Sequence, residues 1–131
     1  AGDDARVITV DAVRTALLEL HRRLLDAERR DYERLRGRVS DSEFLDVIVK
    51  NPDFSWLGAL TTMIVNLDEL DAGAESPGVG KELVAQIRKL LTPAAGGGEF
   101  NRKYETSLQR NPEVTVAHGA VMTALQARRN A

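Results

Sequence analysis

The chain contains no cysteine. It therefore forms no disulfide, and it offers no thiolate to a zinc or iron–sulfur site and no thiol nucleophile for catalysis. It is also poor in aromatic residues, which make up 5% of the sequence, and in proline, of which there are four. Because prolines end or kink helices, so few of them leave room for long helical segments.

Long apolar runs and an excess of one charge are also missing. No apolar run approaches the ~18 residues of a membrane-spanning helix, so we expect no membrane association. Eighteen basic residues stand against twenty acidic ones, and the formal net charge of −2 argues against nucleic-acid binding through an overall positive field. The short, acidic and polar start of the chain is unlike a signal peptide, and we expect a cytoplasmic protein.

The residues that are present suffice for one hydrophobic core. The 131 residues, 43% of them hydrophobic, fit a single domain spanning 1–131. Apolar residues recur at steps of three and four nearly everywhere, which is the period of an amphipathic helix. We therefore expect an all-α fold, an antiparallel helical bundle of about six helices, four main and two short. Residues 1–8 are expected to be a disordered or vector-derived N-terminus, and 71–80 and 92–98 to be loops.

The first predicted helix has a wide apolar face. It follows Thr9, a favourable N-cap, and ends before Gly37, for a length of roughly 26 residues. Its main apolar stripe consists of Val10, Val13, Leu17, Leu20 and Leu24. A second line beside it consists of Leu18, His21, Leu25, Tyr32 and Leu35. Two adjacent stripes suit packing against two neighbours.

The start of the second helix carries the clearest local signal. Ser40 and Glu43 form a capping box, which predicts a helix over 41–50. Asn51-Pro52-Asp53 ends that helix and begins the next, which we expect to continue as an α-helix to about Leu70. Since this third helix is apolar over more than half of its circumference, we expect it to be central in the bundle. Three further helices are predicted around 83–91, 100–108 and 114–125.

The two histidines have the unperturbed pKa closest to neutrality. His118 falls on the presumed core face of the last helix, and His21 on the flank of the first helix's stripe. One interpretation is a bundle in which a pocket near His21 or His118 holds a metal ion, haem or a small molecule. The other is two partly buried histidines that donate to nearby acceptors. Because the Glu-x-x-His pairs of a di-iron bundle are absent, we expect no metal site and no cofactor.

The densest apolar cluster consists of Phe54, Trp56 and Leu57. Trp is enriched at protein interfaces, so these residues, with Tyr32 and Arg29 of the first helix, are candidates for a dimer interface or a groove. The alternative is that they fill the core of the monomer. Both interpretations hold together if the helix that carries Trp56 is shared between two chains.

Arginines are concentrated between Arg22 and Arg38, a segment with seven arginines and four acids. Guanidinium groups match phosphates and carboxylates, so one interpretation is a surface for phosphates or an acidic partner. Interleaved acids, such as Asp26 four residues before Arg30, instead indicate a solvated helix face with ion pairs. We favour the solvated face and do not expect nucleic-acid binding.

No catalytic motif is recognisable, because no serine lies in a Gly-x-Ser-x-Gly elbow and no glycine-rich segment has the spacing of a phosphate-binding loop. Three segments carry ER-x-YE, DP-x-F-x-WL and I-x-x-DE-like patterns in this order: 28–33, 51–57 and 64–69. In this order they resemble segments of a group of small bacterial all-helical proteins, with Asn51 in the place of the group's Asp. The resemblance is best over residues 1–70, and it implies a bacterial origin and no particular activity.

These observations favour a non-enzymatic helical interaction or regulatory module. The apolar faces of the first and third helices are wider than one small monomer needs, so we expect self-association, as a homodimer, with another protein as the other class of partner. The alternative function is the ligand-binding bundle with a pocket near His21 or His118.

Overall fold

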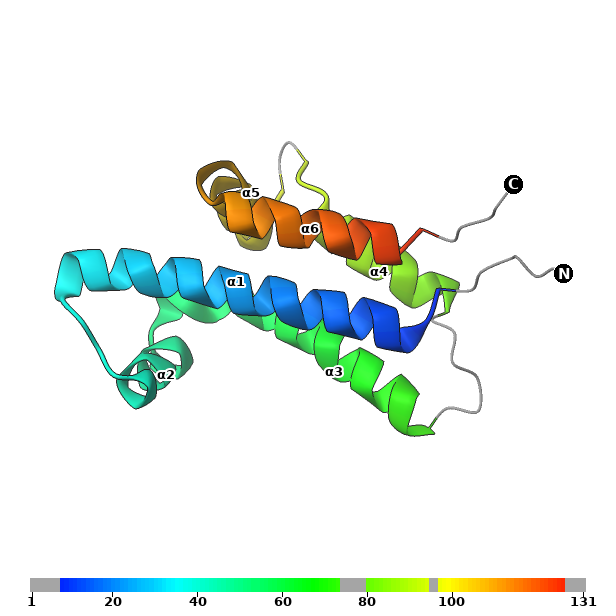
Figure 1. The fold of residues 1–131 in the computed structure, drawn as a ribbon, viewed down its shortest axis with the longest axis horizontal. Helices are drawn as coiled ribbons and strands as arrows, with labels where there is room; N and C mark the ends of the chain where they lie inside the picture. Colours follow the sequence, from blue (N-terminus) through cyan, green and yellow to red (C-terminus); the bar gives the residue numbers. More distant parts are fainter. Residues whose placement is uncertain (1–7, 74–79, 95–96, 127–131) are drawn as a thin grey trace, which may run out of the picture.

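The computed structural model describes residues 8–73, 80–94 and 97–126, and over these ranges the chain is all-α without a strand (Figure 1). Six α-helices and one 3-10 helix, η1, follow one another: α1 (Val10–Arg36), α2 (Asp41–Lys50), η1 (Pro52–Leu57), α3 (Gly58–Gly73), α4 (Lys81–Leu91), α5 (Glu99–Arg110) and α6 (Pro112–Ala124). The predicted helical bundle and its number of helices are confirmed.

The central helix of the bundle is α1, which lies between α6 and α3 and contacts both (Figure 1). Both neighbours run antiparallel to it. Its main stripe, exemplified by Leu17, Leu20 and Leu24, is fully buried and forms the core. The prediction that the third helix would be central is wrong. Although α3 is richer in apolar residues, it packs one face on α1 and leaves Val65 and Leu70 exposed.

The ends of α1 follow the predicted capping chemistry. The Thr9 hydroxyl accepts a hydrogen bond from the Ala12 N–H at 3.2 Å, and the Gly37 N–H donates to the Glu33 carbonyl at 2.8 Å. Gly37 has a φ of 89°, which a residue with a side chain rarely adopts. The chain can therefore leave α1 sharply and return toward α2.

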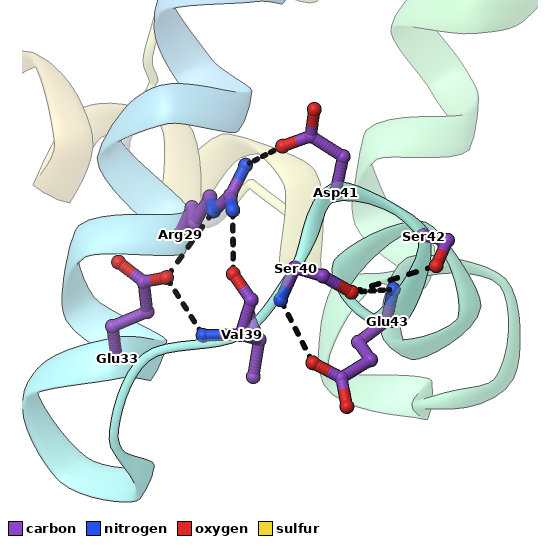
Figure 2. Close-up of polar contacts among 7 residues, drawn as sticks. All are labelled: Arg29, Glu33, Val39, Ser40, Asp41, Ser42 and Glu43. Carbon is purple, nitrogen blue, oxygen red and sulfur yellow. Dashed lines mark hydrogen bonds and ion pairs between the residues drawn. The ribbon is translucent and has the colours of Figure 1, made fainter.

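The predicted capping box of α2 is confirmed (Figure 2). The Ser40 hydroxyl accepts from the Glu43 N–H at 3.1 Å, and the Glu43 carboxylate accepts from the Ser40 N–H at 2.8 Å. Two N–H groups that no helical carbonyl can reach are thus paired. This local arrangement fixes where α2 begins.

The α-helix expected from Pro52 to Leu70 begins instead as η1 and becomes α-helical at Gly58. The Asn51 carbonyl accepts from the Phe54 N–H at 3.0 Å, an i→i+3 bond, and the Asn51 side chain accepts from the Asp53 N–H at 2.9 Å. With three residues per turn, a 3-10 helix places Phe54 and Leu57 on one side and Trp56 on another. All three side chains are buried, so the tighter turn lets a short segment serve two parts of the core.

The loop and terminus predictions need small corrections. Helix α3 continues to Gly73, so the segment predicted as a loop over 71–80 begins in helix, and 74–79 lies outside the described residues. Residues 92–94, 97 and 98 are non-helical as predicted, and 95–96 lies outside. Ile8 packs against the core, which contradicts the expected disorder of 1–8 at its last residue, while 1–7 lies outside the described part.

Candidate functional site

Arg29 fastens the start of α2 to α1 (Figure 2). Its guanidinium donates to the Val39 carbonyl at 2.6 Å, to the Asp41 carboxylate at 2.8 Å and to the Glu33 carboxylate at 3.3 Å. The same Glu33 oxygen accepts from the Val39 N–H at 3.0 Å. That backbone hydrogen bond, more than Arg29 itself, holds the pKa of the Glu33 carboxyl below its usual value. Arg29 is thus committed to contacts within its own chain.

The five residues predicted as interface candidates make contacts inside the monomer. Phe54, Trp56 and Leu57 are at most 7% exposed. Tyr32 is half-buried, and its ring centroid lies 6.2 Å from that of Phe54. Arg29 makes the contacts described above. The sequence shows that these residues are apolar or of a type common at interfaces. Which of them are buried in the monomer depends on the tertiary structure.

A different set of apolar residues reaches the surface. Leu18 is 42% exposed, Leu45 63%, Val49 74% and Val65 46%. They come from three helices, α1, α2 and α3, and the half-buried Leu25 and Ile48 extend the set. Leu25, Leu45 and Ile48 line the same two cavities between α1 and α2. We call these residues the apolar face: Leu18, Leu25, Leu45, Ile48, Val49 and Val65.

Two polar contacts fix how α1 and α3 lie against each other along this face. Arg14 of α1 forms an ion pair with Asp68 of α3, and seven residues further along α1 His21 meets Thr61 of α3. On α1, Leu18 lies between Arg14 and His21. On α3, Val65 lies between Thr61 and Asp68. Because α1 and α3 are antiparallel, the exposed side chains of Leu18 and Val65 lie opposite each other across the groove between the two helices.

The apolar face ends in an ion pair on each side. The Arg14–Asp68 pair is at one end, and the Arg29–Asp41 pair is at the other. The two arginines are fifteen residues apart on α1, so the apolar stretch between them is about 22 Å long at the helical rise of about 1.5 Å per residue. The first end carries one charge of each sign, whereas at the other end Arg29 contacts the carboxylates of both Asp41 and Glu33.

His21 lies within this stretch. It lines a cavity of about 250 Å³ with Leu25, Leu45 and Ile48 among others, and its Nε2 is 3.4 Å from the Thr61 hydroxyl. Burial lowers the pKa of its imidazole. At neutral pH, His21 is therefore an uncharged group on an otherwise apolar face.

His118 lies elsewhere, between α6 and α5. Its Nδ1 is 2.7 Å from the hydroxyl of Tyr104, a fully buried side chain, and the two rings are 5.6 Å apart. Burial lowers the pKa of the His118 imidazole and raises the pKa of the Tyr104 phenol. Each histidine has a hydroxyl partner from a different helix, so the structure does not bring His21 and His118 together in one pocket.

Part of the arginine-rich segment is paired with acids. Arg23 meets Glu19 at 2.7 Å and Arg34 meets Asp31 at 3.0 Å. Arg30 pairs with Glu113 at the start of α6. The arrangement matches the predicted solvated helix face with ion pairs.

No protein-family model matches the chain, and no curated protein or solved structure shows significant similarity to it. Among the helices that the structure describes, none combines the length and hydropathy needed to cross a membrane. Within the same ranges, no group of three or more His, Asp or Glu side chains is placed to hold a metal ion.

Proposed function

We propose that this protein is a non-enzymatic helical interaction module that self-associates through the apolar face. The observation that carries the proposal is where the exposed apolar side chains gather. Of the seven large apolar side chains that are exposed in the described residues, four belong to this face. Contiguous apolar patches are uncommon on monomeric proteins and often mark interaction sites.

The arrangement of charges supports a second copy of the chain as the occupant. Along α1, arginines stand at both ends of the apolar stretch and His21 stands near its middle. A second copy placed antiparallel about a two-fold axis brings the Arg14–Asp68 pair of one chain to the Arg29–Asp41 pair of the other. Apolar side chains then meet apolar side chains, and each end of the apolar stretch brings groups of both charge signs to the other.

The size of the face sets the expected strength of association. A standard interface covers about 800 Å² of each partner, roughly a tenth of the 8038 Å² surface of this chain. Two adjacent helices, each about 10 Å wide and about 22 Å long, present a flat area of about 440 Å², roughly half of the standard size. Interfaces below the standard size are typical of weak, transient complexes, so we expect a dimer that forms at micromolar rather than nanomolar concentration.

The remaining parts of the proposal rest on the sequence. We propose a regulatory role without catalysis, in the cytoplasm of a bacterium, with another protein as the alternative partner of the same face. The bacterial origin rests on the resemblance of the segments around Tyr32, Trp56 and Asp68 to the small bacterial helical proteins.

Sedimentation equilibrium over a micromolar concentration range tests self-association. We expect the unmodified chain to shift from monomer to dimer. The Val65→Glu variant should stay monomeric, because a dimer would bury an unpaired carboxylate within the interface. A chain that stays monomeric at every concentration would refute the proposal.

Val116→Glu is the matched control. Val116 is 74% exposed on α6, away from the apolar face, so the same substitution there adds the same charge to a helix surface. This variant should dimerise like the unmodified chain. Equal loss of dimer in both variants would show that added charge, rather than the apolar face, controls association.

The ligand-binding bundle is the second candidate function, and the cavity beside His21 is the observation that favours it. It would hold a small molecule or a metal ion through the imidazole. Native mass spectrometry of protein purified without added metal or chelator tests this candidate. A bound mass that His21→Gln removes would support it, and a bare chain would count against it.

A further inference from the structure

A polar cleft lies at the far end of α1 from its N-terminus, between α1, η1 and α5. Its volume is about 390 Å³, within the range of small-molecule sites. None of the residues that define the apolar face lines it. Ligand binding in this cleft is therefore independent of self-association through the apolar face.

The walls of the cleft differ in charge. Glu28 and Asp31 of α1 and Asp53 of η1 bring carboxylates, while Lys103 and Arg110 of α5 bring cations. Arg36 also lines the cleft, but its guanidinium lies over the Tyr32 ring, 5.6 Å from the centroid. One wall is thus predominantly acidic and the facing wall is basic.

The two walls pair with each other only in part. The Lys103 ammonium donates to the Asp53 main-chain carbonyl at 3.0 Å, and the Arg110 guanidinium is 3.7 Å from the Asp31 carboxylate. The Lys103 ammonium also forms an ion pair with Glu99, at 3.3 Å, outside the cleft. Both cations still retain donors that these contacts do not use, since an ammonium has three and a guanidinium five.

Glu28 is the polar group that the fold does not explain. It is half-buried, and its carboxylate makes no hydrogen bond or ion pair with any residue that the structure describes. Burial raises the pKa of this carboxyl, the neighbouring Asp31 raises it further, and Lys103 and Arg110 act in the opposite direction. A partly buried carboxylate without a partner costs stability, which makes a bound cationic group a reason for its presence.

An aromatic surface completes the cleft. Tyr32 and Phe54 line it, with ring centroids 6.2 Å apart at an interplanar angle of 63°. Their rings offer an apolar contact between the acidic and the basic wall. A ligand that uses all three features carries an ammonium group, a carboxylate and an apolar or aromatic body.

We propose that this cleft binds a small zwitterion of the α-amino acid type, with its ammonium group toward Glu28 and its carboxylate toward Arg110 and Lys103. A simple cation would meet repulsion from the basic wall, and a simple anion from the acidic one. A ligand with both charges is attracted by both walls.

Three matched probes test this assignment by NMR titration of the full chain. L-phenylalanine carries both charges, phenethylamine lacks the carboxylate, and 3-phenylpropionate lacks the ammonium group. We expect saturable binding of L-phenylalanine with a dissociation constant of about millimolar order, as suits so small a ligand. Each singly charged analogue should bind at least about tenfold more weakly, because one charged hydrogen-bonded contact is lost.

Variants locate the binding site. Glu28→Gln and Arg110→Gln should each weaken L-phenylalanine binding by about tenfold or more. Glu105→Gln and Arg23→Gln remove the same kinds of charge outside the cleft and should leave binding unchanged. The fold of Glu28→Gln is expected to be intact, since at neutral pH this variant removes a carboxylate whose ionisation burial disfavours.

Each contrary outcome overturns the proposal. If none of the three probes gives saturable shifts, the cleft is not a zwitterion site. If phenethylamine binds as tightly as L-phenylalanine, the basic wall contributes nothing and the ligand class is wrong. If the control variants weaken binding as much as Glu28→Gln, the ligand binds elsewhere.

Discussion

The hydrogen bond between Tyr104 and His118 gives a prediction whose size follows from the structure. Tyr104→Phe removes only the hydroxyl that lies 2.7 Å from the His118 Nδ1, and the stacking of residue 104 on Phe100 at 5.3 Å is kept. A hydrogen bond of this kind contributes a net ~1 kcal/mol. His118 is only half-buried, so water can reach its ring and we expect no larger loss.

This loss converts into a measurable change in Tm. Unfolding entropy is about 2.1 cal/mol/K per residue, so for a chain of this length 1 kcal/mol corresponds to a decrease of about 4 °C. The assay is thermal unfolding followed by circular dichroism above about pH 7.5, where the lowered pKa of His118 keeps the imidazole neutral in the folded state. In the unfolded chain the His118 imidazole is also largely neutral at this pH. The measurement therefore reports the hydrogen bond rather than a change of protonation.

Tyr32→Phe is the matched control for this prediction. Tyr32 is half-buried, and its hydroxyl forms no hydrogen bond to another residue in the part of the chain described. Removing it should change Tm by no more than about 1 °C, as for a surface substitution. If both variants lower Tm equally, or if Tyr104→Phe lowers Tm as much in a His118→Gln background as it does when His118 is present, the hydrogen bond to His118 is not the cause of the loss.

Two further predictions concern the α2 cap and the pH dependence of association. Ser40→Ala should lower the free energy of unfolding by about 1 kcal/mol and Tm by about 4 °C. Ser42→Ala, at the second residue of α2, should have little effect. A denaturant titration of both variants checks this. The pKa of His21 is lowered by burial, so stability is fully present above about pH 6.5 and decreases as the pH falls toward the folded-state pKa, because the unfolded chain binds the proton first. Dimerisation covers His21 further, so the dimer should weaken as the pH falls below about 6.5, the ordinary pKa of histidine, and His21→Gln should remove that dependence in sedimentation experiments. An unchanged dependence in the variant would contradict the role of His21.

The helix boundaries could be predicted because they depend on contacts between near neighbours. Thr9, Ser40 and Gly37 act on groups three or four residues away, and such signals are legible in a sequence. The 3-10 form of η1 was not predictable in this way. Pro52 and Asn51 allow either helix type, and the choice depends on burying Phe54 and Trp56 in two different parts of the core.

The candidate surfaces were harder to predict, for a physical reason. Hydrophobicity indicates that a residue tends to be buried, but not whether the available neighbours suffice to cover it. Trp56 packs against Phe100, at a centroid distance of 5.5 Å. Leu45 and Val49 of the short α2 have too few neighbouring side chains to cover them and stay exposed. The second apolar line of α1, which includes Leu18 and Leu25, did indicate an apolar face wider than the core can bury.

The polar cleft left even less trace in the sequence. Glu28 and Arg110 are separated by most of the chain, and each looks like an ordinary charged residue on a helix surface. Only the packing of α5 beside the end of α1 and η1 makes them walls of one space. A signal of this kind arises from tertiary structure and has no counterpart in local spacing.

Trp56 is the only tryptophan of the chain, and its indole N–H is buried without a hydrogen-bond partner in the described part of the structure. Its fluorescence therefore comes from a single, dry environment next to Phe100. Emission at short wavelength should report the integrity of the contact between η1 and α5, and it should move to longer wavelength only when that contact opens. Because the indole lies away from the apolar face, the chain carries a built-in optical reporter that separates loss of fold from loss of partner.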